Sequence, residues 1–154
     1  MFKIVRKKEL NSAVTLMEIE APFVAKKAKA GQFIIFRVDE TGERVPLTIA
    51  GYDREKGTVA IIFQKVGLTT KMLGAMNEGD YIQDFVGPLG KPTNTEGIKR
   101  VCVVGGGVGC AIAFRPLRRS RRQAPRSMSL SASAARISSF WKTSSRPAAT
   151  ICTS

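Results

Sequence analysis

Residues 1–90 consist of short runs of mostly apolar side chains separated by polar turns. Six runs are rich in β-branched and aromatic residues and partly alternate apolar with polar positions, a pattern typical of strands with one buried face. They cover residues 2–10, 14–22, 32–38, 45–52, 58–66 and 81–90. Turn signals such as Glu40–Glu43 and Arg54–Gly57 lie between them. Many short strands joined by glycine-containing turns predict a small antiparallel β-barrel.

One segment of this region has a helical pattern instead. Residues 69–80 begin at a threonine, contain good helix formers and stop at Gly79, so they predict a short helix. After a polar linker at 93–100, Val101–Val104 form a continuous apolar run that meets a cluster of glycines and then helix-compatible residues. A parallel αβ unit begins in this order. The crossover helix and second parallel strand that such a unit needs are not legible after Phe114.

Composition divides the chain at the same place. Residues 1–114 hold 16 basic and all 12 acidic residues, a net charge of +4, whereas residues 115–154 hold 9 basic and no acidic residues. All 14 glycines precede residue 110, and most serines follow residue 115. The overall net charge of +13 would by itself suggest a nucleic-acid or membrane partner, but most of that charge belongs to the tail. The first part has the composition of an ordinary soluble domain.

The residue types present exclude several classes of site. The chain has no histidine, so a histidine-based triad, a histidine general base and a histidine metal ligand are excluded. Cys102, Cys110 and Cys152 match no zinc spacing and no disulfide framework, and the first two are expected to be small core residues. The sequence shows neither a signal peptide nor an apolar run long enough to span a membrane. We therefore expect a cytoplasmic protein with no membrane partner.

A glycine cluster follows the apolar strand directly and consists of Gly105, Gly106, Gly107 and Gly109. Glycines let backbone N–H groups approach a phosphate, and the N-terminus of a following helix adds a positive field. The spacing departs from G-x-G-x-x-G, because Cys110 stands where the third glycine would be. The turn therefore either binds a nucleotide phosphate or is a tight strand–helix connection without a ligand.

Five motifs occur in one order along residues 1–114: AGQFIIFRV, GERVPLTIAGYD, GTVAIIFQKVGLTTKMLGAMNEGD, DFVGPLG and VCVVGGGVGCAIAF. Together they resemble the ferredoxin–NADP reductase superfamily, and within it the small flavin-carrying electron-transfer subunits of ferredoxin:NADP oxidoreductase (sulfide dehydrogenase) and of dihydroorotate dehydrogenase. The resemblance implies an all-β antiparallel FAD-binding barrel over residues 1–98. The first strand and turn of an α/β nicotinamide-binding domain would follow over residues 99–114, with Gly87–Gly90 as the hinge.

The resemblance also implies which residues hold FAD. The corresponding positions are Arg44, Pro46, Leu47, Thr48, Ile62, Phe63, Gln64, Thr69 and Thr70. The pyrophosphate would bind at the two threonines, because two hydroxyls and the free N–H groups of a helix N-terminus suit an anion. Arg44 stands one residue earlier than in the family pattern, and Leu47 replaces an aromatic residue. The alternatives are a plain strand start at Pro46 and Leu47 and a plain N-cap at the threonines.

The activity that the resemblance implies is FAD-dependent electron transfer between NAD(P)H and a redox centre on a larger partner subunit, with ferredoxin as a further candidate partner. The four glycines would then bind the NAD(P) phosphates. No catalytic side chain is expected, because hydride transfer between cofactors depends on positioning more than on acid–base groups. The family carries a C-terminal cysteine cluster that holds an iron–sulfur centre. No such cluster is legible here, so we expect that centre to be absent.

The basic, serine- and arginine-rich tail at residues 115–154 has competing interpretations. In the first, the reading frame shifts near the codon of Phe114: shifted codons permit a helix-then-strand pattern that would complete the αβ unit. The tail would then be disordered, and the chain would keep at most flavin binding. In the second, the tail is a genuine basic arm that binds nucleic acid or anionic lipid through the arginines at 118, 119, 121 and 122. A gene remnant that does not fold is the third hypothesis.

Overall fold

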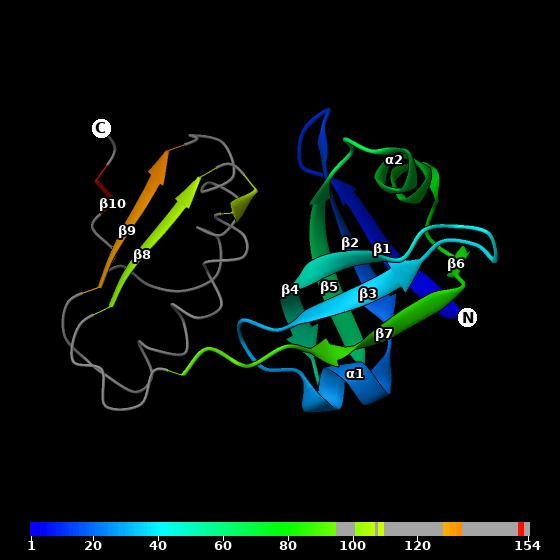
Figure 1. The fold of residues 1–154 in the computed structure, drawn as a ribbon, viewed down its shortest axis with the longest axis horizontal. Helices are drawn as coiled ribbons and strands as arrows, with labels where there is room; N and C mark the ends of the chain where they lie inside the picture. The colour runs from blue at the N-terminus through cyan, green and yellow to red at the C-terminus, as the bar shows by residue number, and fades with distance from the viewer. Residues whose placement is uncertain (95–100, 107, 110–127, 134–150, 153–154) are drawn as a thin grey trace. The chain divides into compact units, whose positions relative to one another are not determined.

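The structure, a computed structural model, describes residues 1–94, 101–106, 108–109, 128–133 and 151–152. The chain divides into two compact units, Met1–Pro92 and Thr93–Ser154. Figure 1 shows the ribbon of both units, and each is described here by itself. The prediction that the barrel extends to residue 98 stays a prediction, because residues 95–100 lie outside the described part.

The first unit is a curled antiparallel sheet with two short helices. Its strands are β1 (Phe2–Glu9), β2 (Val14–Glu20), β3 (Phe33–Arg37), β4 (Val45–Asp53), β5 (Thr58–Gln64), β6 (Tyr81–Ile82) and β7 (Asp84–Leu89), in the order β6-β1-β2-β5-β4-β3-β7. The two edge strands, β6 and β7, are separated by Gln83 alone, so one continuous segment borders both edges of the sheet. The predicted antiparallel barrel is confirmed, and the predicted strand over 81–90 is divided in two by this change of partner.

Alternation along the strands builds the interior of the barrel. On β5, Val59, Ile61 and Phe63 are buried in the main hydrophobic cluster. Phe36 on β3 and Phe85 on β7 face each other across the sheet in register, and both are fully buried in the same cluster. Because successive side chains of a strand point to opposite faces, the residues between these positions lie on the outer face of the barrel.

One polar group in this interior lacks a partner. Thr15 on β2 is fully buried, and its hydroxyl makes no hydrogen bond within the described part of the chain. A buried hydroxyl without a partner carries a desolvation cost. We therefore expect Thr15→Val to raise the free energy of unfolding by about 1 kcal/mol, measured by urea denaturation. Thr58→Val, at a half-buried position on β5, is the matched control and should bring no gain; an unchanged or lower stability of Thr15→Val would contradict the prediction.

The helices differ in part from the prediction. Helix α1 (Pro22–Lys27) was not predicted, because the strand pattern of residues 14–22 runs into it; proline at its first turn and alanine and lysine after it favour the helix. The guanidinium of Arg54 donates hydrogen bonds to the carbonyl oxygens of Lys26 and Ala28 at its C-terminal end. Helix α2 (Leu68–Ala75) is the predicted helix, but its N-cap is Gly67 and it ends before Met76, not at Gly79.

The second unit contains a parallel sheet of three strands, in the order β10-β9-β8: β8 (Val101–Gly106), β9 (Met128–Ser133) and β10 (Ile151–Cys152). The predicted strand at Val101–Val104 is confirmed and continues through two glycines. A second parallel strand, which the sequence did not reveal, lies in the tail that composition predicts to be disordered. The physical reason is strict alternation: residues 128–133 read MSLSAS, a period of two that suits a strand. Residues 110–127, where a crossover helix would have to lie, are outside the described residues.

Candidate functional site

The predicted flavin residues lie where two neighbouring strands separate. Strands β4 and β5 pair only from Ile49↔Ile61 to Asp53↔Thr58. The head of β4, residues 45–48, pairs with β3, and the end of β5, residues 62–64, pairs with β2. In the described pairing, these two segments are not joined to each other. Backbone polar groups along their facing edges are therefore available to a flat ligand that carries hydrogen-bonding groups on its rim.

Alternation sorts the side chains of these segments into two sets. Leu47 packs against the hydrophobic cluster, and Phe63 belongs to it, so both point into the barrel. A ligand on the outside could meet only the backbone of these two residues. Pro46 and Thr48 on β4 and Ile62 and Gln64 on β5 occupy the alternate positions on the outer face, where Ile62 is nevertheless only 5% exposed. The structure thus brings four of the predicted side chains to one face and places the other two in the core.

Helix α2 follows the end of β5 after a short turn. The Thr70 hydroxyl accepts hydrogen bonds from the backbone N–H groups of Val66 and Gly67 and donates one to the carbonyl oxygen of Gly67. Thr70 is therefore the N3 residue of a helix whose N-cap is Gly67, and neither threonine is the plain N-cap that the sequence left open. The Thr69 hydroxyl, almost fully buried, donates to the carboxylate of Glu43 at 3.2 Å. Any anion at this helix start would therefore be bound by backbone N–H groups rather than by these two hydroxyls.

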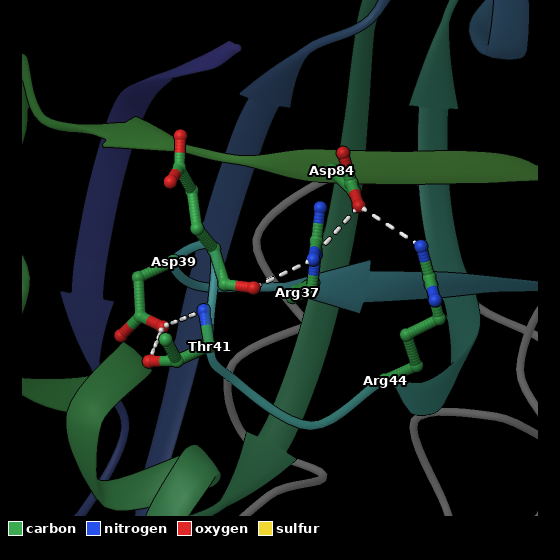
Figure 2. A network of polar contacts seen from close by, with 6 residues as sticks. Arg37, Asp39, Thr41, Arg44 and Asp84 are labelled. Carbon is green, nitrogen blue, oxygen red and sulfur yellow. Dashed lines mark hydrogen bonds and ion pairs between the residues drawn. The ribbon is translucent and has the colours of Figure 1, made fainter.

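Arg44 directly precedes β4 and follows Glu43, whose carboxylate is the one bonded to Thr69. Its side chain is 65% exposed, and one terminal nitrogen lies 3.6 Å from the carboxylate of Asp84. Arg37 forms a shorter ion pair with the same oxygen, at 2.7 Å (Figure 2). An exposed guanidinium with free N–H donors is a suitable partner for a phosphate group.

Sequence reasoning missed three residues that form polar contacts around the start of β4: Arg37, Glu43 and Asp84. Glu43 was visible only as part of a turn signal, and nothing local distinguishes Asp84 from other surface acids. The register shows why they matter, since Arg37 and Asp84 are direct cross-strand partners 47 residues apart. No single-sequence pattern reports such a pairing.

The glycine cluster of the second unit is only partly described. Gly105 and Gly106 belong to β8 and not to a turn. Gly107 lies outside the described residues, and an added Cβ at Gly109 would meet no atom of the described part of the chain within 4 Å. Packing against the described residues therefore does not require glycine at position 109. The assignment of these residues to a nucleotide phosphate stays a prediction.

Within the described ranges, no group of three or more His, Cys, Asp or Glu side chains could hold a metal ion. No helix in the described part is long and apolar enough to cross a membrane.

Several known proteins are similar to this chain in sequence. No protein-family model matches the chain. A protein of Clostridium beijerinckii named "Uncharacterized protein in adh 3'region" is 58% identical over 121 residues, covering 74% of this chain and 41% of that protein. A dihydroorotate dehydrogenase B electron transfer subunit homolog of Thermotoga maritima is 41% identical over 122 residues, covering 79% of this chain and 43% of the relative. The chain thus spans less than half the length of these curated relatives.

Solved structures agree. The structure of an NADH-dependent reduced ferredoxin–NADP oxidoreductase, described in work on flavin-based electron bifurcation, matches with a TM-score of 0.80 and 38% identity, over 86% of this chain and 48% of that one. Phthalate dioxygenase reductase has a TM-score of 0.71 at 20% identity, a likeness of fold alone. By sequence and by fold, the chain matches proteins of the ferredoxin–NADP reductase superfamily, and several of the relatives that it matches in sequence are named dihydroorotate dehydrogenase B electron transfer subunit.

Proposed function

We propose that the barrel binds FAD on its outer face and that the protein acts as an FAD-dependent electron-transfer subunit. The observation that carries the proposal is the separation of β4 from β5 directly beside the start of α2. An isoalloxazine ring needs a flat surface and hydrogen-bonding backbone edges, and a pyrophosphate needs a cationic, N–H-rich corner. The separated strands support the first requirement, and the start of α2, with Arg44 next in sequence to Glu43, supports the second.

The residues present fit this cofactor. Pro46 and Thr48 would lie against the ring, the nearly buried Ile62 would offer it little surface, and the backbones of Leu47 and Phe63 would meet its polar edge. Arg44 and the backbone N–H groups at the start of α2 would bind the pyrophosphate. When bound, the flavin supplies the redox chemistry, accepting electrons as a hydride and releasing them singly. The protein's part is to hold the ring in place, to exclude water from one of its faces and to fix the phosphates.

For the electron donor and acceptor, we propose only the class of molecule. The named relatives are electron-transfer subunits, which supports a larger redox subunit as partner. NAD(P)H is proposed as the other partner, supported by the parallel strand β8 and the glycines that follow it. Ferredoxin as acceptor and the absence of an iron–sulfur centre remain predictions.

The reading-frame hypothesis for residues 115–154 also stays a prediction, and resequencing the DNA around the Phe114 codon tests it.

The proposal is tested by flavin uptake. The purified full chain, incubated with FAD and passed through a desalting column, should carry visible flavin absorbance and quench the fluorescence of the ligand. Titration with riboflavin, which has the ring but no phosphate, should give weaker binding. A chain that folds, as judged by circular dichroism, yet remains colourless after incubation would refute the proposed function.

The same site yields a prediction for Glu43. Its carboxylate accepts a hydrogen bond from Thr69 at the start of α2, close to where the pyrophosphate would bind. Because like charges repel, Glu43→Gln should tighten FAD binding by roughly fivefold, equivalent to about 1 kcal/mol. Glu40→Gln, an exposed acid on the same loop, is the matched control and should change little. Equal affinities for the Glu43→Gln variant and the unaltered chain would place the phosphate elsewhere.

A further inference from the structure

Three charged side chains form a row across the outer face of the barrel. Arg37 and Asp84 are direct partners between β3 and β7, and the pairing of Phe36 with Val45 puts Arg44 beside Arg37 on the next strand. Figure 2 shows the three side chains converging, with Asp84 reaching both guanidinium groups. One carboxylate oxygen of Asp84 serves both arginines, at 2.7 Å and 3.6 Å. Segments far apart in the sequence thus meet in one ion-pair network.

The two arginines have different roles in this network. Arg37 also donates a hydrogen bond to the carbonyl oxygen of Glu40, at 2.8 Å, and its side chain is only 21% exposed. It therefore fixes the loop between β3 and β4. Arg44 is largely exposed and, within the described part of the chain, makes no polar contact other than that with Asp84. Most of its five N–H donors remain available to a ligand.

Without Asp84, this row would hold two neighbouring cations and no anion. Like charges on adjacent strands destabilise each other, and an exposed arginine has a large rotamer entropy. Repulsion from Arg37 would turn the Arg44 guanidinium toward solvent. The carboxylate removes the repulsion and restricts Arg44 at the same time.

We propose that Asp84 is a positioning residue that holds Arg44 ready for the phosphate groups of the flavin dinucleotide. The inference rests on the proposed function and adds a residue outside the segments that would touch the cofactor. Pre-orienting a charged fork lowers the entropy lost when it binds a phosphate. Asp84 therefore contributes to FAD affinity through Arg44 and not by contact of its own.

The test is a double-mutant cycle on the full chain, with FAD affinity as the readout. Removing a carboxylate also raises the local positive charge, which by itself would tighten FAD binding, so a weakening cannot come from net charge alone. We expect Asp84→Asn to weaken FAD binding about threefold, the size expected for an ion pair with an exposed partner. In an Arg44→Ala background, Asp84→Asn should have no further effect. Riboflavin binding should be the same with and without Asp84.

Glu18→Gln is the matched control. Glu18 forms a cross-strand ion pair with Arg6 at 3.3 Å and has the same exposure as Asp84, 28% against 29%, but lies on β2. It should leave FAD affinity unchanged. If Asp84→Asn fails to fold, Asp84→Glu keeps the charge but displaces it by one methylene group, and a smaller loss, again absent without Arg44, is expected.

Two results would overturn the inference: unchanged FAD affinity in the Asp84 variants, or an equal loss in the presence and absence of Arg44, which would indicate a purely structural role. Failure of the proposed function is a separate outcome. If the unaltered chain takes up no FAD, flavin binding itself is refuted and the inference is refuted with it.

Discussion

Arg44→Ala is expected to weaken FAD binding by roughly 30-fold, because a hydrogen bond to a charged phosphate contributes about 1.5–3 kcal/mol. The guanidinium is largely exposed and paired with Asp84, and Arg44 follows Glu43, which is bonded to the helix start where the pyrophosphate is proposed. Affinity for riboflavin, which lacks phosphate, should be unaffected. Fluorescence titration of the purified full chain with each ligand measures the difference.

Arg6→Ala provides the control for this substitution. Arg6 is also an exposed arginine in a cross-strand ion pair, with Glu18, but it lies on β1. The Arg6→Ala substitution removes the same charge outside the proposed site, so FAD affinity should be unchanged. Comparable losses in both variants would mean that Arg44 acts only through the net charge of the barrel.

Phe36→Ala is expected to lower the free energy of unfolding by about 3–5 kcal/mol, the usual cost of removing a fully buried aromatic ring. Phe36 is 0% exposed and pairs in register with Val45 on one side and Phe85 on the other. Since small domains have stabilities of about 5–15 kcal/mol, this loss would take much of the stability of the barrel. Urea denaturation followed by circular dichroism gives the value.

The control for Phe36 is another phenylalanine. Phe23, on α1, is 85% exposed, so Phe23→Ala should change stability by no more than about 0.5 kcal/mol. Phe36 also lies directly before Arg37, so its loss should loosen the charged row and lower FAD affinity in the same preparation. A Phe36→Ala variant as stable as the Phe23→Ala variant would mean that the barrel interior is not packed around this ring.

The strands of the barrel could be predicted because each carries its own signal. Alternation on β2 and β5 and the glycine-containing turns gave their bounds to within a few residues. Helix α1 was missed because a six-residue helix at the end of a strand has too little periodicity to be seen. Strand β9 was missed because an arginine- and serine-rich composition concealed a short alternating stretch.

The candidate site was predictable only as a set of segments. The family resemblance selected residues 44–48, 62–64 and 69–70 without distinguishing side chains that face a ligand from those in the core. The structure assigns Leu47 and Phe63 to the interior, and it engages the hydroxyls of Thr69 and Thr70 in bonds to the protein itself.

The amino-acid order by itself determined the antiparallel barrel, the apolar interior and the family, because these depend on local periodicity and on motifs contiguous in the chain. Only the tertiary structure decided where β4 departs from β5 and which charges share a carboxylate. Strand register is set by the packing of the whole sheet, and it brings Arg37, Arg44 and Asp84 together although no local pattern links them. The chemistry proposed for this protein depends on that register.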